Sequence, residues 1–358
     1  VAGCKNLREL NVQGCTHIYL RGRVTAELYD FLAGIDDTNI EGCFSEGLAL
    51  SPTTYAHLME GKDFSCFKDN ILIFPSHDET EQDQAAVERL RAVEIVELVE
   101  EGFKLAGDVS VLGICDRLQS FSMAGCAPRA TRHPPRARTK GELPPLIFSL
   151  VLEGKADMRG CTLTPPTASA LEQASDQVRD RLKAVQCVDL SVYDEVTKSK
   201  IEELEEELRL AKRVDKALGD HARVFEIREK IDDVRSTKSK VLFEGDVGDI
   251  VTWFERIESV NMEGQRLIRG AITDITEQPW AADLTALSLA GCKRVRGKIT
   301  DITDQPWAAN LTMLGLPPWV TGHLRELAPC GKLSDLSVCG AEPKSNVDSI
   351  FSKSCDEF

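Results

Sequence analysis

Cysteine and large apolar residues recur at fixed spacing in Cys115-Asp-Arg-Leu118-Gln-Ser-Phe121-Ser-Met123-Ala-Gly-Cys126. The pattern is C-x-x-L-x-x-L-x-L-x-x-C, where L stands for any large apolar residue. Residues 4–15 repeat it position for position, and residues 330–341 depart from it only at the last place. Apolar residues two positions apart are typical of a strand that buries one face. The pattern therefore predicts several equivalent short strands along the chain.

Three further copies follow one another near the C-terminus. Their first apolar residues are Ile257, Leu284 and Leu311, each 27 residues after the last. The segments between them repeat as well, because residues 270–283 are nearly copied in residues 297–310, including Ile-Thr-Asp-Ile-Thr and Gln-Pro-Trp-Ala-Ala. One such strand cannot bury itself, whereas stacked copies form a continuous core. We therefore expect an α/β solenoid, with short parallel strands on a concave face and helices or irregular turns on the convex face.

The composition limits the classes of partner and compartment. The net charge of −15 argues against nucleic acid as the main partner, because phosphate binding needs clustered Lys and Arg. No apolar run is long enough to span a bilayer, so we expect no membrane partner. The twelve cysteines are too few for a disulfide scaffold. Half of them follow a Gly in a repeat-like context, which favours reduced, buried thiols in a cytoplasmic or nuclear protein: Cys4, Cys15, Cys43, Cys126, Cys161 and Cys292.

The order of these features predicts six segments. They are N-terminal repeats at 1–126, a basic Pro-rich linker at 127–145, degenerate repeats at 146–195, a charged helical hairpin at 196–242, C-terminal repeats at 243–341 and a polar tail at 342–358. The start at Val1 resembles the end of a repeat strand, so we interpret the chain as a fragment lacking its native N-terminus. Within the segments, helices are expected at 26–32, from Pro52 onward, at 85–103 and at 168–184, with a strand at 71–74.

Two segments are left with alternatives. Residues 127–145 concentrate Arg and Pro and are predicted to be a disordered linker, or else a basic docking peptide for an acidic partner. Residues 198–240 carry two apolar stripes at helical spacing, which predicts an αα-hairpin or short coiled coil. The stripes either bury against each other or leave the hairpin as an arm for a homodimer.

Signatures of catalysis and metal binding are weak. Residues 291–299 resemble a phosphate loop, but the glycines are one position too far apart and Ile299 lacks the hydroxyl that would bind Mg²⁺. Residues 77–83 place carboxylates beside His77, where a solvated helix start is the simpler interpretation. Asp274 and Asp301 are interpreted as structural turns, and Trp280 and Trp307 as convex-side core. We therefore expect no enzyme activity, no catalytic residue, no metal and no cofactor.

The framed cysteine units resemble the cysteine-containing leucine-rich repeats of F-box-type substrate receptors and of ribonuclease-inhibitor-like proteins. The resemblance covers about half of the chain and implies a leucine-rich-repeat solenoid, interrupted by the hairpin, that binds another protein on its concave face. The implied partner-binding residues are the polar x positions of the frame: Arg8, Glu9, Asn11, Gln13, Gln119, Ser120, Ser122, Glu258, Ser259, Asn261, Glu263, Thr285, Ser288, Thr312, Ser334, Asp335 and Ser337.

The first hypothesis is therefore a non-enzymatic interaction scaffold. One alternative is the substrate-recognition subunit of a ubiquitin ligase, which would need an adaptor-binding helical domain upstream of Val1. The other is a structural protein that self-assembles through the helical hairpin.

Overall fold

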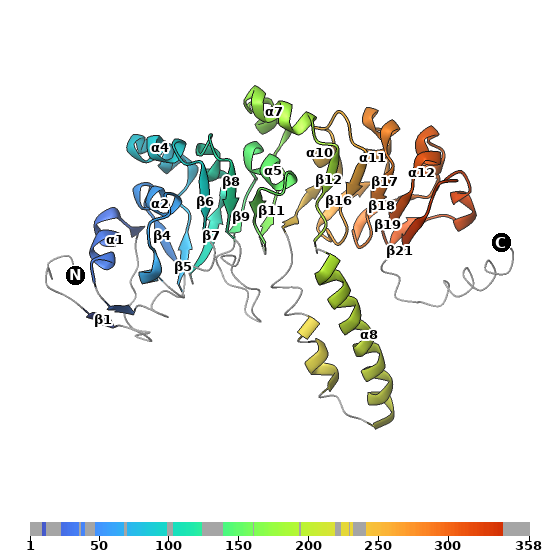
Figure 1. Cartoon of the computed structure of the whole chain (residues 1–358), viewed down its shortest axis with the longest axis horizontal. Coiled ribbons are helices and arrows are strands. Elements are labelled where there is room, and N and C mark those ends of the chain that lie inside the picture. Colours follow the sequence, from blue (N-terminus) through green and yellow to red (C-terminus); the bar gives the residue numbers. More distant parts are fainter. Residues whose placement is uncertain are drawn as a thin grey trace. The chain divides into compact units, whose positions relative to one another are not determined.

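A computed structural model describes twelve stretches of the chain: residues 9–11, 23–35, 37–39, 47–67, 70–98, 103–123, 139–159, 161–192, 195–218, 223–228, 230–231 and 241–338. These residues form a mixed α/β structure with parallel sheets (Figure 1). The chain divides into two compact units. Unit 1 comprises residues 1–179 and 193–242, and unit 2 comprises residues 180–192 and 243–358.

Unit 2 contains two parallel sheets between which the chain alternates. The first, here called the five-strand sheet, is ordered β12 (Cys187–Asp189), β15 (Ser259–Asn261), β17 (Ala286–Ser288), β19 (Met313–Leu316) and β21 (Asp335–Val338). The second, the four-strand sheet, is ordered β14 (Gly245–Asp246), β16 (Ile268–Ala271), β18 (Arg294–Lys298) and β20 (Trp319–Thr321). Each sequence copy thus supplies one strand to each sheet.

The register of the five-strand sheet aligns the three copies spaced by 27 residues. Val260 lies opposite Leu287, and Leu287 lies opposite Leu314. All three are completely buried, as are the frame-opening residues Ile257, Leu284 and Leu311. The prediction that these copies form equivalent, neighbouring parallel strands is therefore confirmed.

Short helices connect the two sheets of unit 2. The helices α10 (Val247–Val251), α11 (Thr273–Thr276) and α12 (Thr300–Thr303) follow strands of the four-strand sheet, and the 3₁₀ segments η3 (Pro279–Asp283), η4 (Pro306–Asn310) and η5 (Leu324–Leu327) lead back to the five-strand sheet. Asp274 accepts a hydrogen bond from the Ala271 N–H at 2.7 Å, and Asp301 accepts the equivalent bond from Lys298. Trp280 and Trp307 are buried. The turn role predicted for the two Asp residues and the burial predicted for the two Trp residues are confirmed.

Unit 1 is built in a similar way. One parallel sheet is ordered β2 (Arg23–Val24), β4 (Leu48–Leu50), β5 (Ile71–Ile73), β7 (Lys104–Asp108) and β9 (Thr139–Lys140). Another is ordered β10 (Ala156–Asp157), β8 (Ser120–Ser122) and β6 (Ile95–Glu97), and β1 (Glu9–Asn11) pairs with β3 (Asp37–Asn39). The short strand β11 (Thr162–Leu163) follows β10 in the sequence.

The helices of unit 1 begin at clear capping residues. Ser51 caps α2 (Pro52–Met59) and Thr25 caps α1 (Ala26–Ala33). The helices expected from Pro52 onward and at 26–32 are therefore both present. The remaining elements are η1 (Ser65–Phe67), α3 (His77–Gln82), η2 (Val109–Ile114) and α5 (Pro145–Leu152). The core of this unit includes the stacked rings of Tyr29 and Phe64, with centroids 4.6 Å apart.

The helix expected at 85–103 is wrong beyond its first half. Helix α4 (Gln84–Arg91) ends early, and β6 follows it. In the strand, Val96 and Leu98 are buried whereas Ile95 and Glu97 are exposed, so the burial period is two. Glutamates interleaved with apolar residues are typical of an amphipathic helix, which is why a helix was expected. The β-branched residues of the segment favour a strand.

Two other boundaries also differ from expectation. The helix expected at 168–184 is divided into α6 (Ala168–Glu172) and α7 (Asp176–Lys183), and the Ser175 side chain receives the N–H of Val178 at the start of α7. The last part of the linker expected at 127–145 is ordered, because it contains β9 and the first residue of α5. Residues 127–138 lie outside the described residues.

The charged segment forms the expected hairpin. Helix α8 (Glu195–Leu218) lies alongside the helical residues 223–228 and 230–231 (Figure 1). The two apolar stripes bury against each other, and their shared core contains Leu204, Ala211, Val224, Ile227 and Ile231. The alternative in which the stripes bury each other is therefore the one observed.

The hairpin lies in sequence between two neighbouring strands of the five-strand sheet. Cys187 in β12 is in register with Ser259 in β15, although 71 residues separate them in sequence. The fully buried Gln265 side chain joins the chain on either side of the insertion. Its Nε2 donates to the Leu190 carbonyl at 2.7 Å, and its Oε1 accepts from the Phe243 N–H at 2.8 Å. One amide therefore satisfies backbone groups on both flanks of the insertion.

Candidate partner-binding faces

The exposed face of the five-strand sheet carries two rows of side chains. In a strand, alternate residues point to the same side, and Val188, Val260 and Leu287 point inward. The outward residues therefore align across the sheet by register. One row is Cys187, Ser259, Ala286, Met313 and Asp335, and the other is Asp189, Asn261, Ser288, Gly315 and Ser337.

Most side chains in these rows are short, which makes the surface even. Ser288 and Gly315 lie side by side, and a Cβ atom on Gly315 would lie 2.4 Å from the Ser288 Oγ. Ser288 is only 5% exposed, so its hydroxyl is less accessible than the prediction of a contact residue implied. Ser259 and Asn261 remain half-exposed. A partner could therefore approach the strand backbones closely here.

A ladder of hydroxyl groups runs along the edge where the strands begin. The Thr285 Oγ1 donates to the Glu258 carbonyl at 3.0 Å, and the Thr312 Oγ1 donates to the Thr285 carbonyl at 3.1 Å. The Ser334 Oγ continues the ladder to the Thr312 carbonyl at 3.0 Å. These predicted contact residues are exposed, yet their hydroxyls already join one copy to the next. Their first role is to fix the spacing of the strands.

Acidic and amide groups lie at the opposite end of the same strands. The Asn261 Oδ1 accepts the Glu263 N–H at 3.1 Å, and the Asp189 Oδ1 accepts the Ser191 N–H at 3.0 Å. The two turns are therefore built alike, as expected where a short polar side chain hydrogen-bonds the backbone two residues on. Glu263 is half-exposed, and Asp189 is exposed in the first strand. These groups give this end of the face a negative charge.

Residues that share this face were missing from the predicted set. Ala286 and Met313 occupy x positions of the frame, but only polar x residues were selected from the sequence. Cys187 and Asp189 belong to β12, which was not among the framed repeats. Selecting the x positions of every strand, including the apolar ones, would have identified these four residues.

Unit 1 carries a smaller face on its three-stranded sheet. Ser120 and Ser122 are half-exposed in the central strand β8, as predicted, with Ile95 and Glu97 beside them in β6. Ile95 is 62% exposed, which is unusual for a residue of this size. Gln119 lies just before the strand, and its Nε2 donates to Glu94 at 3.2 Å.

The predicted residues near the N-terminus are only partly described. Glu9 and Asn11 lie in β1, with Asp37 and Asn39 of β3 as their register partners. Arg8 and Gln13 lie outside the described residues.

The cysteines of the repeat frame are buried where the structure describes them. Cys115, Cys161, Cys292 and Cys330 are all buried, whereas Cys187 is exposed. The Cys292 thiol donates to the Met262 carbonyl at 3.1 Å. Burial raises the pKa of Cys115 and of Cys292 to about 12, so both are neutral thiols at physiological pH. The frame cysteines therefore act as small core residues, as predicted for Cys161 and Cys292.

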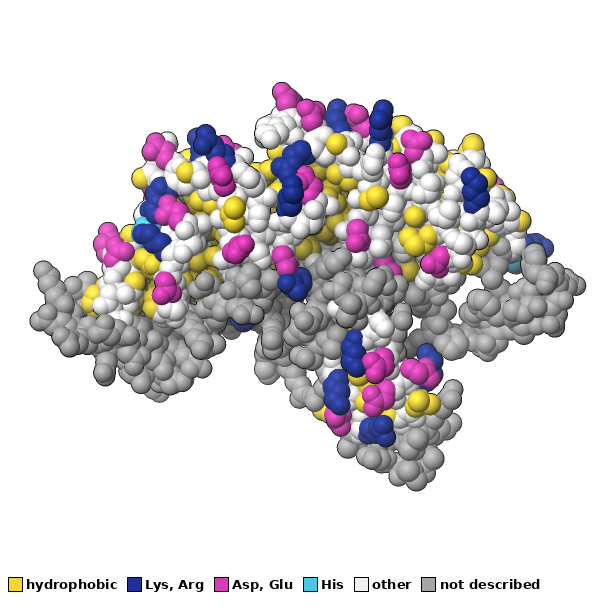
Figure 2. All heavy atoms as spheres, viewed as in Figure 1, with side chains coloured by type: hydrophobic (Ala, Val, Ile, Leu, Met, Phe, Trp, Pro, Cys, Tyr) yellow, Lys and Arg dark blue, Asp and Glu magenta, His cyan; other side chains and the backbone are white. Residues whose placement is uncertain are grey.

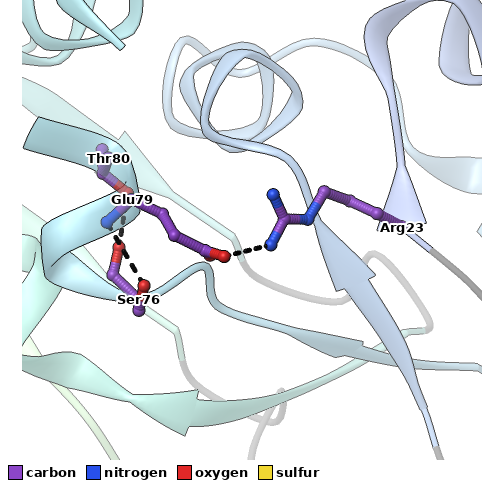
Figure 3. Close-up of polar contacts among 4 residues, drawn as sticks. All are labelled: Arg23, Ser76, Glu79 and Thr80. Carbon is purple, nitrogen blue, oxygen red and sulfur yellow. Dashed lines mark hydrogen bonds and ion pairs between the residues drawn. The ribbon is translucent and has the colours of Figure 1, made fainter. Parts of the chain in front are cut away.

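The predicted solvated helix start at His77 is confirmed as the first turn of α3. The Ser76 hydroxyl receives the Glu79 N–H, and Glu79 forms an ion pair with Arg23 of β2 at 2.6 Å (Figure 3). His77, Asp78 and Glu81 bring their ligand atoms within 4.8 Å of one another. That distance would suit a divalent cation, but the His77 Nδ1 also lies 3.7 Å from the Glu81 carboxylate, which explains the arrangement by itself.

Charged side chains of both signs lie on the described surface of the protein. Lys, Arg, Asp and Glu side chains are interspersed over the helices on the face drawn in Figure 2. Among the described residues, no helix combines the length and apolar character needed to cross a bilayer.

Comparison with protein-family models, with curated proteins and with solved structures finds no match to this chain. The resemblance to leucine-rich repeats therefore remains a prediction from the repeat frame.

Proposed function

We propose that the protein is a non-enzymatic scaffold, built as a leucine-rich-repeat solenoid, that binds a partner protein on the exposed face of the five-strand sheet. The observation that supports it most directly is the pair of rows that run across all five strands. They combine Ser, Ala, Gly, Asn, Asp and Cys with one Met, and so offer a surface on which nearly every side chain is short.

The strand backbones under this face are held firmly. The inward residues Val260, Leu287 and Leu314 are completely buried, and the hydroxyl ladder ties successive copies together. A rigid surface loses little conformational entropy on binding, which favours affinity. The acidic groups at one end would orient a partner with complementary charge.

The test is to block the face with large charged side chains. Ser259→Arg with Ala286→Arg places two guanidinium groups in the same row, and Ala282→Arg, at an exposed position of η3 outside both sheets, is the matched control. We expect the face variant not to capture the proteins that the wild type and the control both capture. Each captured protein should also bind the purified wild type when measured by calorimetry. The proposal fails if the face variant retains every protein that the wild type captures.

Self-assembly through the hairpin is a second candidate, because two large apolar side chains remain outside its core. Leu210 is 51% exposed and Phe225 is 52% exposed, on the two helices of the same hairpin. Exposed side chains of this size on a helical hairpin can pack against a second copy.

Light scattering separates this candidate from a monomeric scaffold. Self-assembly predicts a dimer that becomes a monomer in Leu210→Glu with Phe225→Lys, while the control Arg228→Gln stays a dimer. A monomeric wild type at tens of micromolar, on the order of common weak dimers, would exclude it.

A further inference from the structure

The outer surface of the four-strand sheet concentrates positive charge in a strongly acidic protein. Residues 266–298 contain six Lys and Arg. Four of these side chains lie on two neighbouring strands: Arg269 in β16 and Arg294, Arg296 and Lys298 in β18. All four are exposed, and the intervening Val295 is completely buried. The cations therefore point away from the core.

The register places these cations close together. Arg269 is directly opposite Arg294, so two guanidinium groups share one row of the sheet. Arg296 is directly opposite Trp319 in β20, and Lys298 is opposite Thr321. Trp319 is 63% exposed. An exposed Trp beside an Arg is the combination that dominates binding energy in many protein interfaces.

Among the described residues, no carboxylate forms an ion pair with Arg269, Arg294, Arg296 or Lys298. Asp301, just beyond β18, accepts the main-chain N–H of Lys298 and forms no ion pair with its side chain. The nearest acid by register is Asp246, opposite Arg269, and its Oδ1 accepts the Gly248 N–H. Clustered like charges at this spacing repel one another, so an anionic ligand would relieve the repulsion.

We propose that this surface binds an extended acidic segment of a partner protein. Arg294, Arg296 and Lys298 are alternate residues of one strand, so each lies about 6.6 Å along the strand from the next. Alternate carboxylates in an extended peptide have the same spacing. Guanidinium groups pair with carboxylates through two parallel hydrogen bonds. Trp319 then receives an apolar side chain from the same segment.

Other polyanions fit this surface less well. A polynucleotide would extend beyond this basic surface and be repelled by the rest of a chain with net charge −15. A short peptide would lie within the basic surface. The surface also offers one aromatic side chain among the described outward residues, and single-stranded nucleic acid is usually held by several.

The test uses the full chain and a fluorescein-labelled peptide of twelve residues in which Glu alternates with Thr, with Leu in place of one central Thr. Fluorescence anisotropy should show saturable binding that weakens with added salt. The same peptide with Gln for Glu should not bind. Arg294→Glu with Arg296→Glu and Lys298→Glu should weaken binding at least about tenfold, the sum expected for several exposed ion pairs.

Two variants guard against a nonspecific result. Arg256→Glu reverses an exposed cation of unit 2 outside this sheet and should leave binding unchanged. Trp319→Ala should weaken binding while circular dichroism shows an unchanged fold. Equal loss in Arg256→Glu, or no binding of the Glu peptide, would overturn the proposal. Tighter binding of twelve-residue oligothymidylate, or of phosphatidylcholine vesicles with one-fifth phosphatidylserine, would overturn it in favour of nucleic acid or membrane.

Discussion

The hydroxyl of Thr312 donates a hydrogen bond to the main-chain carbonyl of Thr285, which lies 27 residues earlier in the chain. The same carbonyl also accepts the Thr312 N–H at 2.8 Å, so one oxygen receives two donors from the next copy. Thr312→Val removes only the side-chain bond and keeps the shape of the residue. We expect it to lower the free energy of unfolding by about 0.5–1.5 kcal/mol. Urea unfolding measures this, and Thr312→Ser, which keeps the hydroxyl, should retain more of the stability.

Gln265 should be far more sensitive than a typical surface glutamine. In Gln265→Leu the Leu190 carbonyl and the Phe243 N–H both lose their buried partner, at an expected cost of about 2–4 kcal/mol. Gln278→Leu is the matched control, because the Gln278 side chain donates one bond, to Asp274, from a partly exposed position. Equal losses in the two variants by urea unfolding would contradict the role given to Gln265.

Gly270 combines a backbone constraint with a steric one. Its φ is +130°, and a Cβ there would lie 2.7 Å from a Val247 methyl and 2.9 Å from Asp246 and Asp274 oxygens. Gly270→Ala should therefore cost at least about 2 kcal/mol, more than the penalty of about 1–2 kcal/mol for the backbone conformation alone. Gly61→Ala is the control, since Gly61 has φ +76° with nothing within 4 Å of the added atom. Thermal unfolding should rank the two in that order.

The buried thiol of Cys292 should make stability fall at alkaline pH. Its pKa is about 12 in the folded protein and about 8.5 in an unfolded chain, so the unfolded state loses the proton first. The stabilising contribution is complete below about pH 8.5 and is lost as the pH rises toward 12. Between pH 7 and pH 10 this amounts to about 2 kcal/mol.

Other groups titrate in the same range, so the measurement is a difference between variants. Cys292→Ala should lose less stability than the wild type between pH 7 and pH 10 in urea unfolding. Cys187→Ala, which removes an exposed thiol, is the matched control. Parallel curves for the wild type and Cys292→Ala would refute the assignment.

The parts of the fold that depend on local spacing could be predicted from sequence. The frame within each 27-residue copy, the helix that begins at Pro52 and the two hairpin stripes each rest on residues close together in sequence. The strand β6 shows why a local reading can still fail. Leu90, Val93, Val96 and Leu98 fit the repeat frame, but the glutamates between them also fit a helix, and only pairing with β8 settles the choice.

The arrangements that depend on distant pairing could not be predicted. Arg296 and Trp319 are 23 residues apart rather than 27, so the repeat period does not align them, and only the register of β18 with β20 does. In sequence, residues 291–299 resemble only a poor phosphate loop. In the structure they contain β18, which places three of their cations on one surface of the sheet. Burial of Ser288 likewise depends on Gly315 in the next copy.

The pairing of β12 with β15 across the hairpin makes this point of the chain a natural site for exchange of modules. Closing a longer loop costs little additional entropy, because the cost grows only with the logarithm of its length. The register of Cys187 with Ser259 and the bridge through Gln265 are set by residues on the flanks, not by the hairpin itself. A guest domain whose ends lie close together could therefore replace residues 198–240 and leave the neighbouring strands in place.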